Sequence, residues 1–287
     1  MRGRVQRIVG FHRRQRHTKP RYLPGVMSNS LFGPDTAFEW RGFEGREGIV
    51  DGRALKVVAP RTPLPGRPWA WRPEFFDAFA DADEQLVARG FHLVYLNVVD
   101  HYGCPKAIAH GDAAYRFLTD STLPDGFRLA PRFAFIALSR AGLFAYNYAI
   151  TFPERVACIY ADNPVCDFKS WPAGFGVGPG SAGDWQKCLA IYSFADEAQA
   201  RAYSGNPVDR IDVIARARIP VLQVIGDADE TVPVSENALR IAAALRAAGS
   251  PYEEIVKPGG LHHPHGLPGN PGPIVEFVMR HTVSVLS

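Results

Sequence analysis

The sequence lacks most features of a membrane, secreted or metal-binding protein. No run of 18 apolar residues occurs among its 287 residues, so we expect no transmembrane helix. Its four cysteines, Cys104, Cys158, Cys166 and Cys188, have no C-x-x-C spacing. Cys158 and Cys166 lie in or beside an apolar run, where cysteine acts as a small hydrophobic residue. We therefore expect reduced thiols in a cytoplasmic protein rather than a disulfide framework.

Acidic residues are absent from the first 26 positions, which hold seven Arg and one Lys. Removing these eight leaves 24 basic and 29 acidic residues, so the net charge of +3 comes from this segment. The segment also lacks the apolar core of a secretory signal. We expect residues 1–30 to be a disordered basic tail, translated from upstream of a start at Met27. A transit peptide and a nucleic-acid-binding arm are the alternatives.

Short apolar strands alternate with helical patterns along the rest of the chain. The predicted strands are 54–60, 91–100, 133–139, 155–165, 219–229 and 252–259, and the predicted helices are 83–90, 107–120, 140–152, 235–250 and 273–286. The strands are nearly continuous in apolar character, which is typical of strands buried on both faces. The glycine-containing segment 37–50 alternates loosely and predicts an antiparallel hairpin at a sheet edge. The sequence therefore predicts an α/β fold over residues 31–287, with a mainly parallel central sheet flanked by helices.

One segment, residues 166–205, interrupts this alternation. It begins with a Gly/Pro-rich loop and continues with helical stretches, which predicts a small cap or lid inserted between two strands of the sheet. Its large aromatic residues either line a substrate cleft or pack the insertion itself. Among them, Trp171 is our candidate for contact with substrate.

Ser139 lies in the stretch IALSRAGLF, residues 136–144, between a predicted strand and a predicted helix. This arrangement is that of a nucleophile elbow, G-x-S-x-G, in which the serine occupies a sharp, strained turn. Ala137 and Ala141 stand where the two glycines are expected. These positions pass close to each other and must be small, and alanine adds only one methyl group at each. Gly142 follows, where it eases packing of the helix.

An acid and a histidine follow two later strands. Asp229 lies in VIGDADETVP, residues 224–233, and His262 lies in KPGGLHHPHGL, residues 257–267. The carboxyl ends of parallel strands meet at one edge of a sheet, where open α/β sheets bind ligands. We therefore expect both side chains near Ser139. Asp227 is a weaker candidate for the acid, and Asp162 and Asp167 are held in reserve.

Residues from about 37 to 285 resemble the α/β-hydrolase superfamily. The matching segments are SRAG at 139–142, GDADETVP at 226–233 and GGLHHPHG at 259–266. The segments PWAWR at 68–72 and CDFKSWP at 166–172 also resemble a bacterial esterase-like branch. The resemblance implies a catalytic triad in the order nucleophile, acid and histidine, which assigns Ser139, Asp229 and His262. It implies no cofactor.

The expected chemistry also needs hydrogen-bond donors for an oxyanion. The backbone N–H of Arg140, at a helix N-terminus, is one expected donor. Many relatives have His-Gly in the loop after the 54–60 strand, whereas this chain has Pro60, Arg61 and Thr62 there. We therefore place the second donor near Trp69 to Trp71.

His263 and His265 are expected to line the site as substrate-binding candidates. The cluster of His262, His263 and His265 offers zinc-type ligands. Three histidines within four residues of a Pro-containing loop rarely point at one centre, so we expect no metal site.

The leading hypothesis is therefore a serine carboxyl-ester hydrolase that acts on a small or carbohydrate-linked ester. A prolyl-oligopeptidase-like peptidase is one alternative, and a ligand-binding homologue that has lost turnover is another. The expected partner is a small-molecule ester, with no nucleic acid and no membrane. The oligomeric state stays open.

Overall fold

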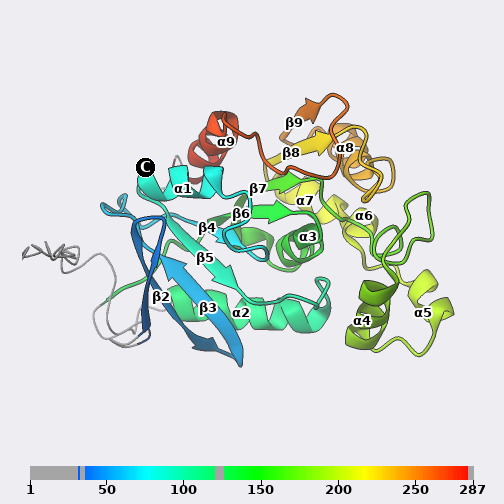
Figure 1. The fold of residues 1–287 in the computed structure, drawn as a ribbon, viewed down its shortest axis with the longest axis horizontal. Helices are drawn as coiled ribbons and strands as arrows, with labels where there is room; N and C mark the ends of the chain where they lie inside the picture. The colour runs from blue at the N-terminus through cyan, green and yellow to red at the C-terminus, as the bar shows by residue number, and fades with distance from the viewer. Residues whose placement is uncertain (1–31, 33–35, 120–125, 284–287) are drawn as a thin grey trace, which may run out of the picture.

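The computed structural model describes residue 32 and residues 36–119 and 126–283 (Figure 1). The expectations for the basic tail, residues 1–30, lie outside these described residues. Within the described part, strands and helices alternate along the chain as the sequence predicts.

The strands form one sheet in the order β1-β2-β3-β5-β4-β6-β7-β8-β9. Their bounds are β1 Ala37–Trp40, β2 Phe43–Val50, β3 Arg53–Val58, β4 Trp69–Arg72, β5 His92–Leu96, β6 Phe133–Leu138, β7 Val156–Asp162, β8 Val221–Gly226 and β9 Tyr252–Lys257. Pairing is antiparallel from β1 to β5 and parallel from there to β9. The predicted mainly parallel sheet with an antiparallel hairpin at one edge is confirmed.

Helices cover both faces of this sheet. Their bounds are α1 Asp81–Ala88, α2 Pro105–Thr119, α3 Ala141–Thr151, α4 Ala182–Tyr192, α5 Glu197–Ala202, α6 Pro207–Arg210, α7 Asp212–Ala217, α8 Ala238–Ala247 and α9 Gly272–Val283, with a 3-10 turn at Pro153–Arg155. Helices α1 and α9 lie together on one face, and α2 and α3 lie on the other (Figure 1). None of the described helices is long and apolar enough to cross a membrane.

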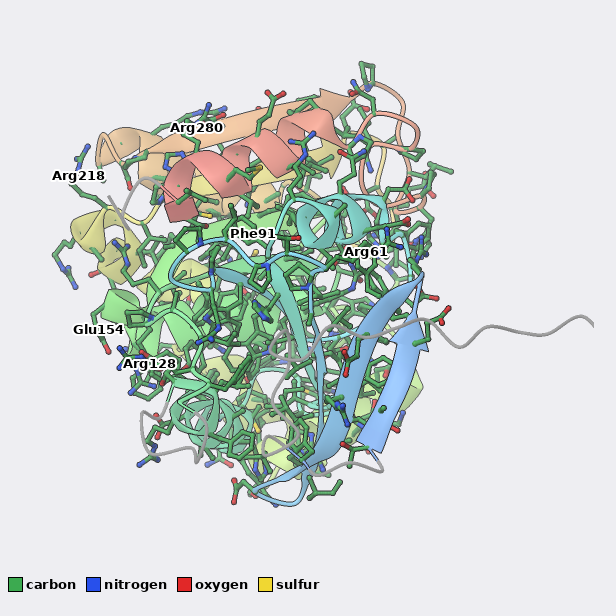
Figure 2. The ribbon with its side chains drawn as sticks, turned by 90° about the vertical axis from the view of Figure 1, so that its left-hand side faces the viewer. Arg61, Phe91, Arg128, Glu154, Arg218 and Arg280 are labelled. Carbon is green, nitrogen blue, oxygen red and sulfur yellow. The ribbon has the colours of Figure 1, made fainter. Side chains whose placement is uncertain are left out.

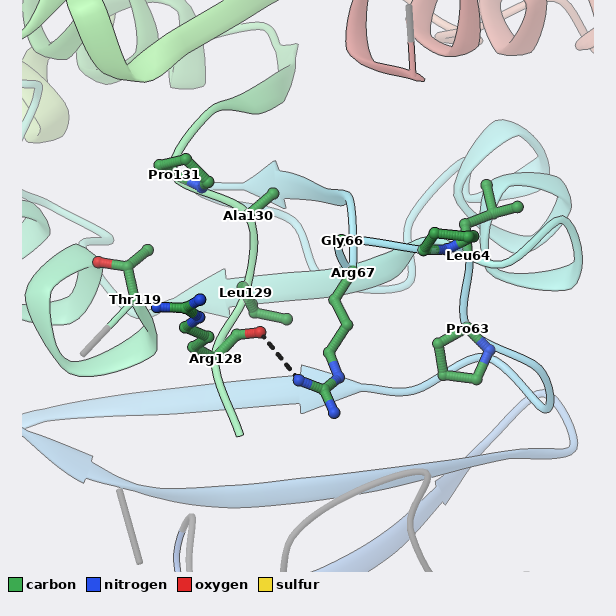
Figure 3. A pocket seen from close by; sticks show the side chains of 10 residues that line it. Pro63, Leu64, Gly66, Arg67, Thr119, Arg128, Leu129, Ala130 and Pro131 are labelled. Carbon is green, nitrogen blue, oxygen red and sulfur yellow. Dashed lines mark hydrogen bonds between the residues drawn. The ribbon is translucent and has the colours of Figure 1, made fainter. Parts of the chain in front are cut away.

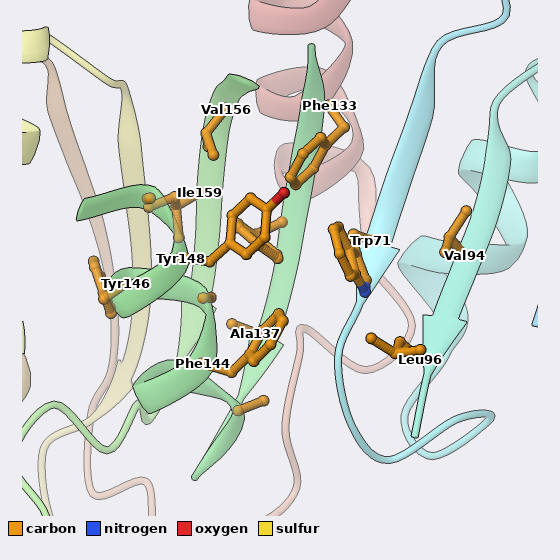
Figure 4. Packing of buried hydrophobic residues seen from close by; sticks show 14 of the residues in the cluster. Trp71, Val94, Leu96, Phe133, Ala137, Phe144, Tyr146, Tyr148, Val156 and Ile159 are labelled. Atoms are coloured by element: carbon orange, nitrogen blue, oxygen red, sulfur yellow. The ribbon is translucent and has the colours of Figure 1, made fainter. Parts of the chain in front are cut away.

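The two faces of the sheet carry separate hydrophobic cores, and strand β6 shows why. Successive side chains of a strand point to opposite faces. Phe133, Phe135 and Ala137 join the core under α2 and α3, where Phe133 packs against Tyr148 (Figure 4). The alternate residues of β6 join the core under α1 and α9. A strand buried on both faces must be apolar throughout, which explains the continuous apolar run in the sequence.

Strand β4 is absent from the predicted elements. Its four residues, Trp69–Arg72, are fully buried and lie between β5 and β6 in the middle of the sheet. Trp71 pairs with Val94 on one side and Phe135 on the other, and its ring packs in the core (Figure 4). The stretch is short and has a proline on each side, so it lacks the length by which a strand is identified.

The surface of the molecule is charged. The side chains of Arg61, Arg128, Arg218 and Arg280 are exposed, whereas Phe91 is fully buried (Figure 2). All four cysteines are free and buried, in agreement with the expected reduced thiols.

Candidate active site

Ser139 occupies a strained turn between β6 and α3. Its φ of 52° lies in the left-handed region, which a residue other than glycine adopts only where the surroundings enforce it. The enforcing contacts are backbone hydrogen bonds: the Ser139 N–H donates to the Asp162 carbonyl, and the Ser139 carbonyl accepts from Gly142 and Val165. A Cβ on Gly142 would stand 2.6 Å from the Val165 carbonyl oxygen, so this position requires glycine.

Three predicted side chains meet at this turn. Ser139 Oγ lies 2.9 Å from His262 Nε2, and His262 Nδ1–H donates to Asp229 Oδ2 at 2.6 Å. The other carboxylate oxygen, Asp229 Oδ1, accepts the backbone N–H groups of Thr231 and Val232, both at 2.9 Å. These bonds fix the carboxylate, which in turn fixes the imidazole so that Nε2 faces the serine.

Close backbone contact brings the acid loop and the histidine loop together. A Cβ on Gly226, the last residue of β8, would stand 2.5 Å from the carbonyl oxygens of Gly260 and Leu261. The buried side chain of Asn163 connects the same two loops. Its Oδ1 accepts from the Gly226 N–H at 2.7 Å, and its Nδ2 donates to the His262 carbonyl at 3.0 Å. No sequence pattern indicated this positioning residue.

The other candidate acids have different partners. Asp227 Oδ1 accepts the Gly259 N–H at 2.6 Å and so connects the same two loops through a backbone bond. Asp167 accepts from the Lys169 N–H and from Arg240. Asp162 lies at the end of β7 and binds His265, with Nδ1–H donating to Oδ1 at 2.7 Å. Among the candidate acids, Asp229 is the one that binds His262.

The Asp162–His265 pair is as buried as the Asp229–His262 pair. Asp162 Oδ2 accepts the Gly266 N–H at 2.8 Å and the Tyr160 hydroxyl at 2.9 Å. The Nζ of Lys257 lies 3.6 Å from Asp162 Oδ1. The pair therefore anchors the loop that follows β9 onto the end of β7.

The three loop histidines lie close together, and the expectation that they form no metal site stays a prediction at this point. One ring nitrogen from each of His262, His263 and His265 lies within 4.8 Å of the others. His263 is exposed and stacks on Phe79, with ring centroids 5.6 Å apart. Partial burial, with His265 and His262 nearby, lowers the pKa of His263.

A pocket of about 280 Å³ opens beside Ser139. Its lining residues are Phe75, Ala78, Phe79, Leu138, Ser139, Arg140, Trp171, Asp184, Thr231, His262, His263 and His265. The three predicted substrate-binding candidates, Trp171, His263 and His265, all lie on its wall. Phe75 and Phe79 also line it, which no sequence pattern indicated; they come from the loop after β4, and both have positive φ.

The placement of the second oxyanion donor near Trp69 and Trp71 needs correction. Both residues lie inside β4, whose backbone pairs with β5 and β6, and neither lines the pocket. The Trp69 indole donates to the Ala130 carbonyl within the core. The chain reaches the pocket only after the strand ends, at Phe75. Arg140 is the N-cap of α3 and lines the pocket, and its backbone N–H stays our prediction for the first donor.

The half-buried Arg140 side chain, next to the nucleophile in sequence, forms an ion pair with the buried Glu74. Its Nε donates to Glu74 Oε2 at 2.5 Å, and its Nη1 lies 3.4 Å from Asp184 Oδ1. Burial raises the pKa of Glu74 to about 7, against the opposing effect of Arg140. No sequence pattern indicated this pair.

The segment 166–205 contributes one wall of the pocket through Trp171 and Asp184. Its other aromatic residues pack among themselves: Trp185, Tyr192 and Phe194 all contact Phe168. The preference for Trp171 as the residue facing a substrate agrees with this placement.

A larger cavity, of about 710 Å³, lies elsewhere. It is lined by residues before β4 and before β6, including Arg67, Leu129 and Pro131, so it opens at the opposite ends of the strands (Figure 3). Arg67 donates to the Arg128 carbonyl across it. Among the described residues that line it, none is a histidine or an acidic residue, and the smaller pocket, which holds Ser139 and His262, is the candidate active site.

Comparison with known proteins supports the same fold. No protein-family model matches the chain. An acylamino-acid-releasing enzyme 2 of Oryza sativa subsp. japonica is 27% identical over 151 residues, which is 50% of this chain and 18% of that protein. The chain thus spans about a fifth of the length of this relative.

Solved structures with this fold include the acylaminoacyl peptidase of Pyrococcus horikoshii and a bifunctional GH43-CE protein of Bacteroides eggerthii. The first has a TM-score of 0.58 and 12% identity over 85% of this chain and 41% of its own. The second has a TM-score of 0.61 and 18% identity over 79% of this chain and 36% of its own. The chain has the α/β-hydrolase fold.

Proposed function

We propose that this protein is a serine hydrolase that cleaves carboxyl esters through an acyl-enzyme. The observation that carries the proposal is the continuous hydrogen-bonded row from Ser139 Oγ through the His262 imidazole to the buried Asp229 carboxylate. A serine in a strained elbow with a base and an orienting acid in this order is the geometry of an activated nucleophile.

The reaction follows from these positions. His262 Nε2 takes the proton of the Ser139 hydroxyl as its oxygen attacks the carbonyl carbon, and the Asp229 carboxylate stabilises the imidazolium that forms. The imidazolium then protonates the leaving alcohol, which leaves the acyl group on Ser139. Water, deprotonated by His262, attacks the acyl-enzyme and releases the carboxylic acid.

The tetrahedral oxyanion needs donors on the side of Ser139 away from His262. The Arg140 N–H lies at the N-terminus of α3, where the helix dipole favours negative charge. For the second donor we propose a backbone N–H of the loop after β4, at Phe75, because this residue lines the pocket together with Arg140.

The pocket supports a small acyl group or a sugar-linked ester. Its volume of about 280 Å³ suits a compact group, and Trp171, Phe75 and Phe79 offer aromatic surfaces for stacking. The similar acylamino-acid-releasing enzyme and acylaminoacyl peptidase favour a second candidate. This is hydrolysis of the amide bond that follows an amino acid whose own amino group is acylated or free. Both reactions use the same triad, and they differ in the leaving group, which is an alcohol for an ester and an amine for an amide.

Two measurements test the proposal. A fluorophosphonate probe should label the wild type at Ser139 and leave Ser139→Ala unlabelled. A ligand-binding homologue without turnover would show no steady-state hydrolysis of any substrate. A panel of aryl acetates, acyl-aminoacyl anilides and aminoacyl anilides then distinguishes esterase from peptidase, since we expect the highest kcat/KM with the acetates. Higher kcat/KM with the anilides would replace the ester assignment by the peptidase one.

A further inference from the structure

Three imidazoles of the histidine loop lie close together in the pocket that holds the nucleophile. The three ring nitrogens lie within 4.8 Å of one another. Three atoms so spaced share a point within about 2.8 Å of each, whereas Zn–N bonds measure about 2.0–2.1 Å. Closing that difference requires each ring to move by less than about 1 Å, which side-chain rotation supplies.

Two of the three rings already have the outer partners that zinc-binding histidines use. A ligating imidazole usually donates its second ring N–H to a carboxylate, which fixes its orientation and raises its basicity. The Nδ1–H of His262 donates to Asp229, and the Nδ1–H of His265 donates to Asp162. The remaining nitrogen of each ring, Nε2, is thereby left to accept a proton or a metal ion.

The third ring, His263, is held at the pocket by Phe79. The two rings stack with an interplanar angle of 14°, and the His263 ring centroid lies 4.8 Å from that of His262 and 4.7 Å from that of His265. His263 is exposed and lies outside the hydrogen-bonded row that reaches Ser139. It is therefore the ligand whose removal leaves the triad intact.

We propose that His262, His263 and His265 form a reversible binding site for a divalent transition-metal ion such as Zn²⁺, and that the bound ion switches off Ser139. Imidazole nitrogen is a preferred ligand of these ions, whereas Mg²⁺ and Ca²⁺ take oxygen ligands. The ion occupies His262 Nε2, the atom that otherwise accepts the Ser139 proton.

Zinc binding is measured first on the full chain, independently of turnover, by competition with a chromophoric chelator in metal-free buffer. We expect the wild type to bind one Zn²⁺ and His263→Ala to bind it about tenfold more weakly or worse, as even loss of an outer-shell partner weakens metal sites that much. His281→Ala is the matched control, because His281 lies on α9 beside Glu253. A His12→Gln/His17→Gln variant removes the two tail histidines, and both controls should bind as the wild type does.

Labelling of Ser139 by fluorophosphonate supplies the second readout. Zn²⁺ should slow labelling of the wild type, EDTA should restore it, Mg²⁺ should not affect it, and His263→Ala should need about tenfold more Zn²⁺ or still more. The proposal would be overturned by equal zinc affinities of the wild type and His263→Ala. It would also be overturned if bound Zn²⁺ left the labelling rate of the wild type unchanged. If the probe does not label the wild type, the proposed hydrolase function is contradicted. The chelator titration would still decide whether the metal site exists.

Discussion

Two histidine–aspartate pairs stand side by side at the carboxyl ends of β7 and β8. His262 binds Asp229 at 2.6 Å and His265 binds Asp162 at 2.7 Å, both through Nδ1. All four side chains are buried, and each carboxylate also accepts backbone N–H bonds. By burial, distance and partner chemistry the two pairs are equivalent.

Only the first pair reaches a nucleophile. His262 Nε2 lies 2.9 Å from Ser139 Oγ, whereas the His265–Asp162 pair fastens its loop to β7. A buried histidine–carboxylate pair therefore does not by itself identify a catalytic base. The group that the second nitrogen faces decides the role, and variants that separate the two pairs test this distinction.

The largest contrast is expected between His262→Ala and His265→Ala. Removing the base that activates a triad serine costs on the order of 10⁶ in kcat in a well-studied protease. His265→Ala should lower kcat by no more than about tenfold, because its ring has no bond to Ser139. Hydrolysis of an aryl acetate measures both, and comparable losses in the two variants would show that the pairs act together.

Replacing the two aspartates should give a smaller difference in kcat, again with the larger loss at the residue that belongs to the triad. Asp229→Asn should lower kcat by about 10⁴, because an amide no longer holds the imidazole in the required tautomer. Asp162→Asn should retain turnover and lose stability, by about 1–3 kcal/mol, since buried donors lose a charged acceptor. Denaturant unfolding and kcat, measured on both variants, separate the two effects. A nearly inactive but stable Asp162→Asn would reverse their assignment.

The sequence predicted the long elements and the order of the polar residues well. Strands such as Phe133–Leu138 bury both faces and leave a continuous apolar run, which needs no knowledge of neighbours to detect. Ser139, Asp229 and His262 each follow such a strand, so their meeting at one sheet edge follows from parallel pairing.

The parts that could not be predicted depend on contacts distant in sequence. Strand β4 is four residues long, and only its place between β5 and β6 makes it a strand. That placement puts Trp69 and Trp71 in the core and delivers Phe75 and Phe79 to the pocket instead. The convergence of His263 and His265 with His262 likewise depends on Asp162, a hundred residues earlier in the chain.

Trp171 extends the comparison to the substrate, because it lines the same pocket as His262. Trp171→Ala should raise KM severalfold and leave kcat nearly unchanged, as expected when a contact made equally in ground and transition states is lost. Trp185→Ala is the matched control, since Trp185 is buried against Phe168 and Phe175 within the same segment. The control should lose about 3–5 kcal/mol of stability without a specific change in KM. An unchanged KM for Trp171→Ala, with a raised KM for Trp185→Ala, would show that Trp171 does not contact the substrate.

A third pair, the half-buried Arg140 and the buried Glu74, extends the comparison with the smallest expected effect on turnover. Glu74 has a pKa of about 7 in the folded protein against 4.5 as its ordinary value, because it is buried. Between these values the folded state holds a proton that the unfolded state has released, so this carboxyl's contribution to stability is full below pH 4.5 and is lost as the pH rises through 7.

Glu74→Gln removes this titration, because glutamine resembles the protonated acid at every pH. The free energy of unfolding of the variant, relative to the wild type, should therefore rise from pH 5 to pH 8. The slope approaches about 1.4 kcal/mol per pH unit within the titration window. Denaturant unfolding at four pH values measures it, while kcat stays within about tenfold because Glu74 contacts Arg140 rather than the triad. Parallel stability curves for variant and wild type would show that Glu74 is already ionised at pH 5 and that Arg140, rather than burial, sets its charge.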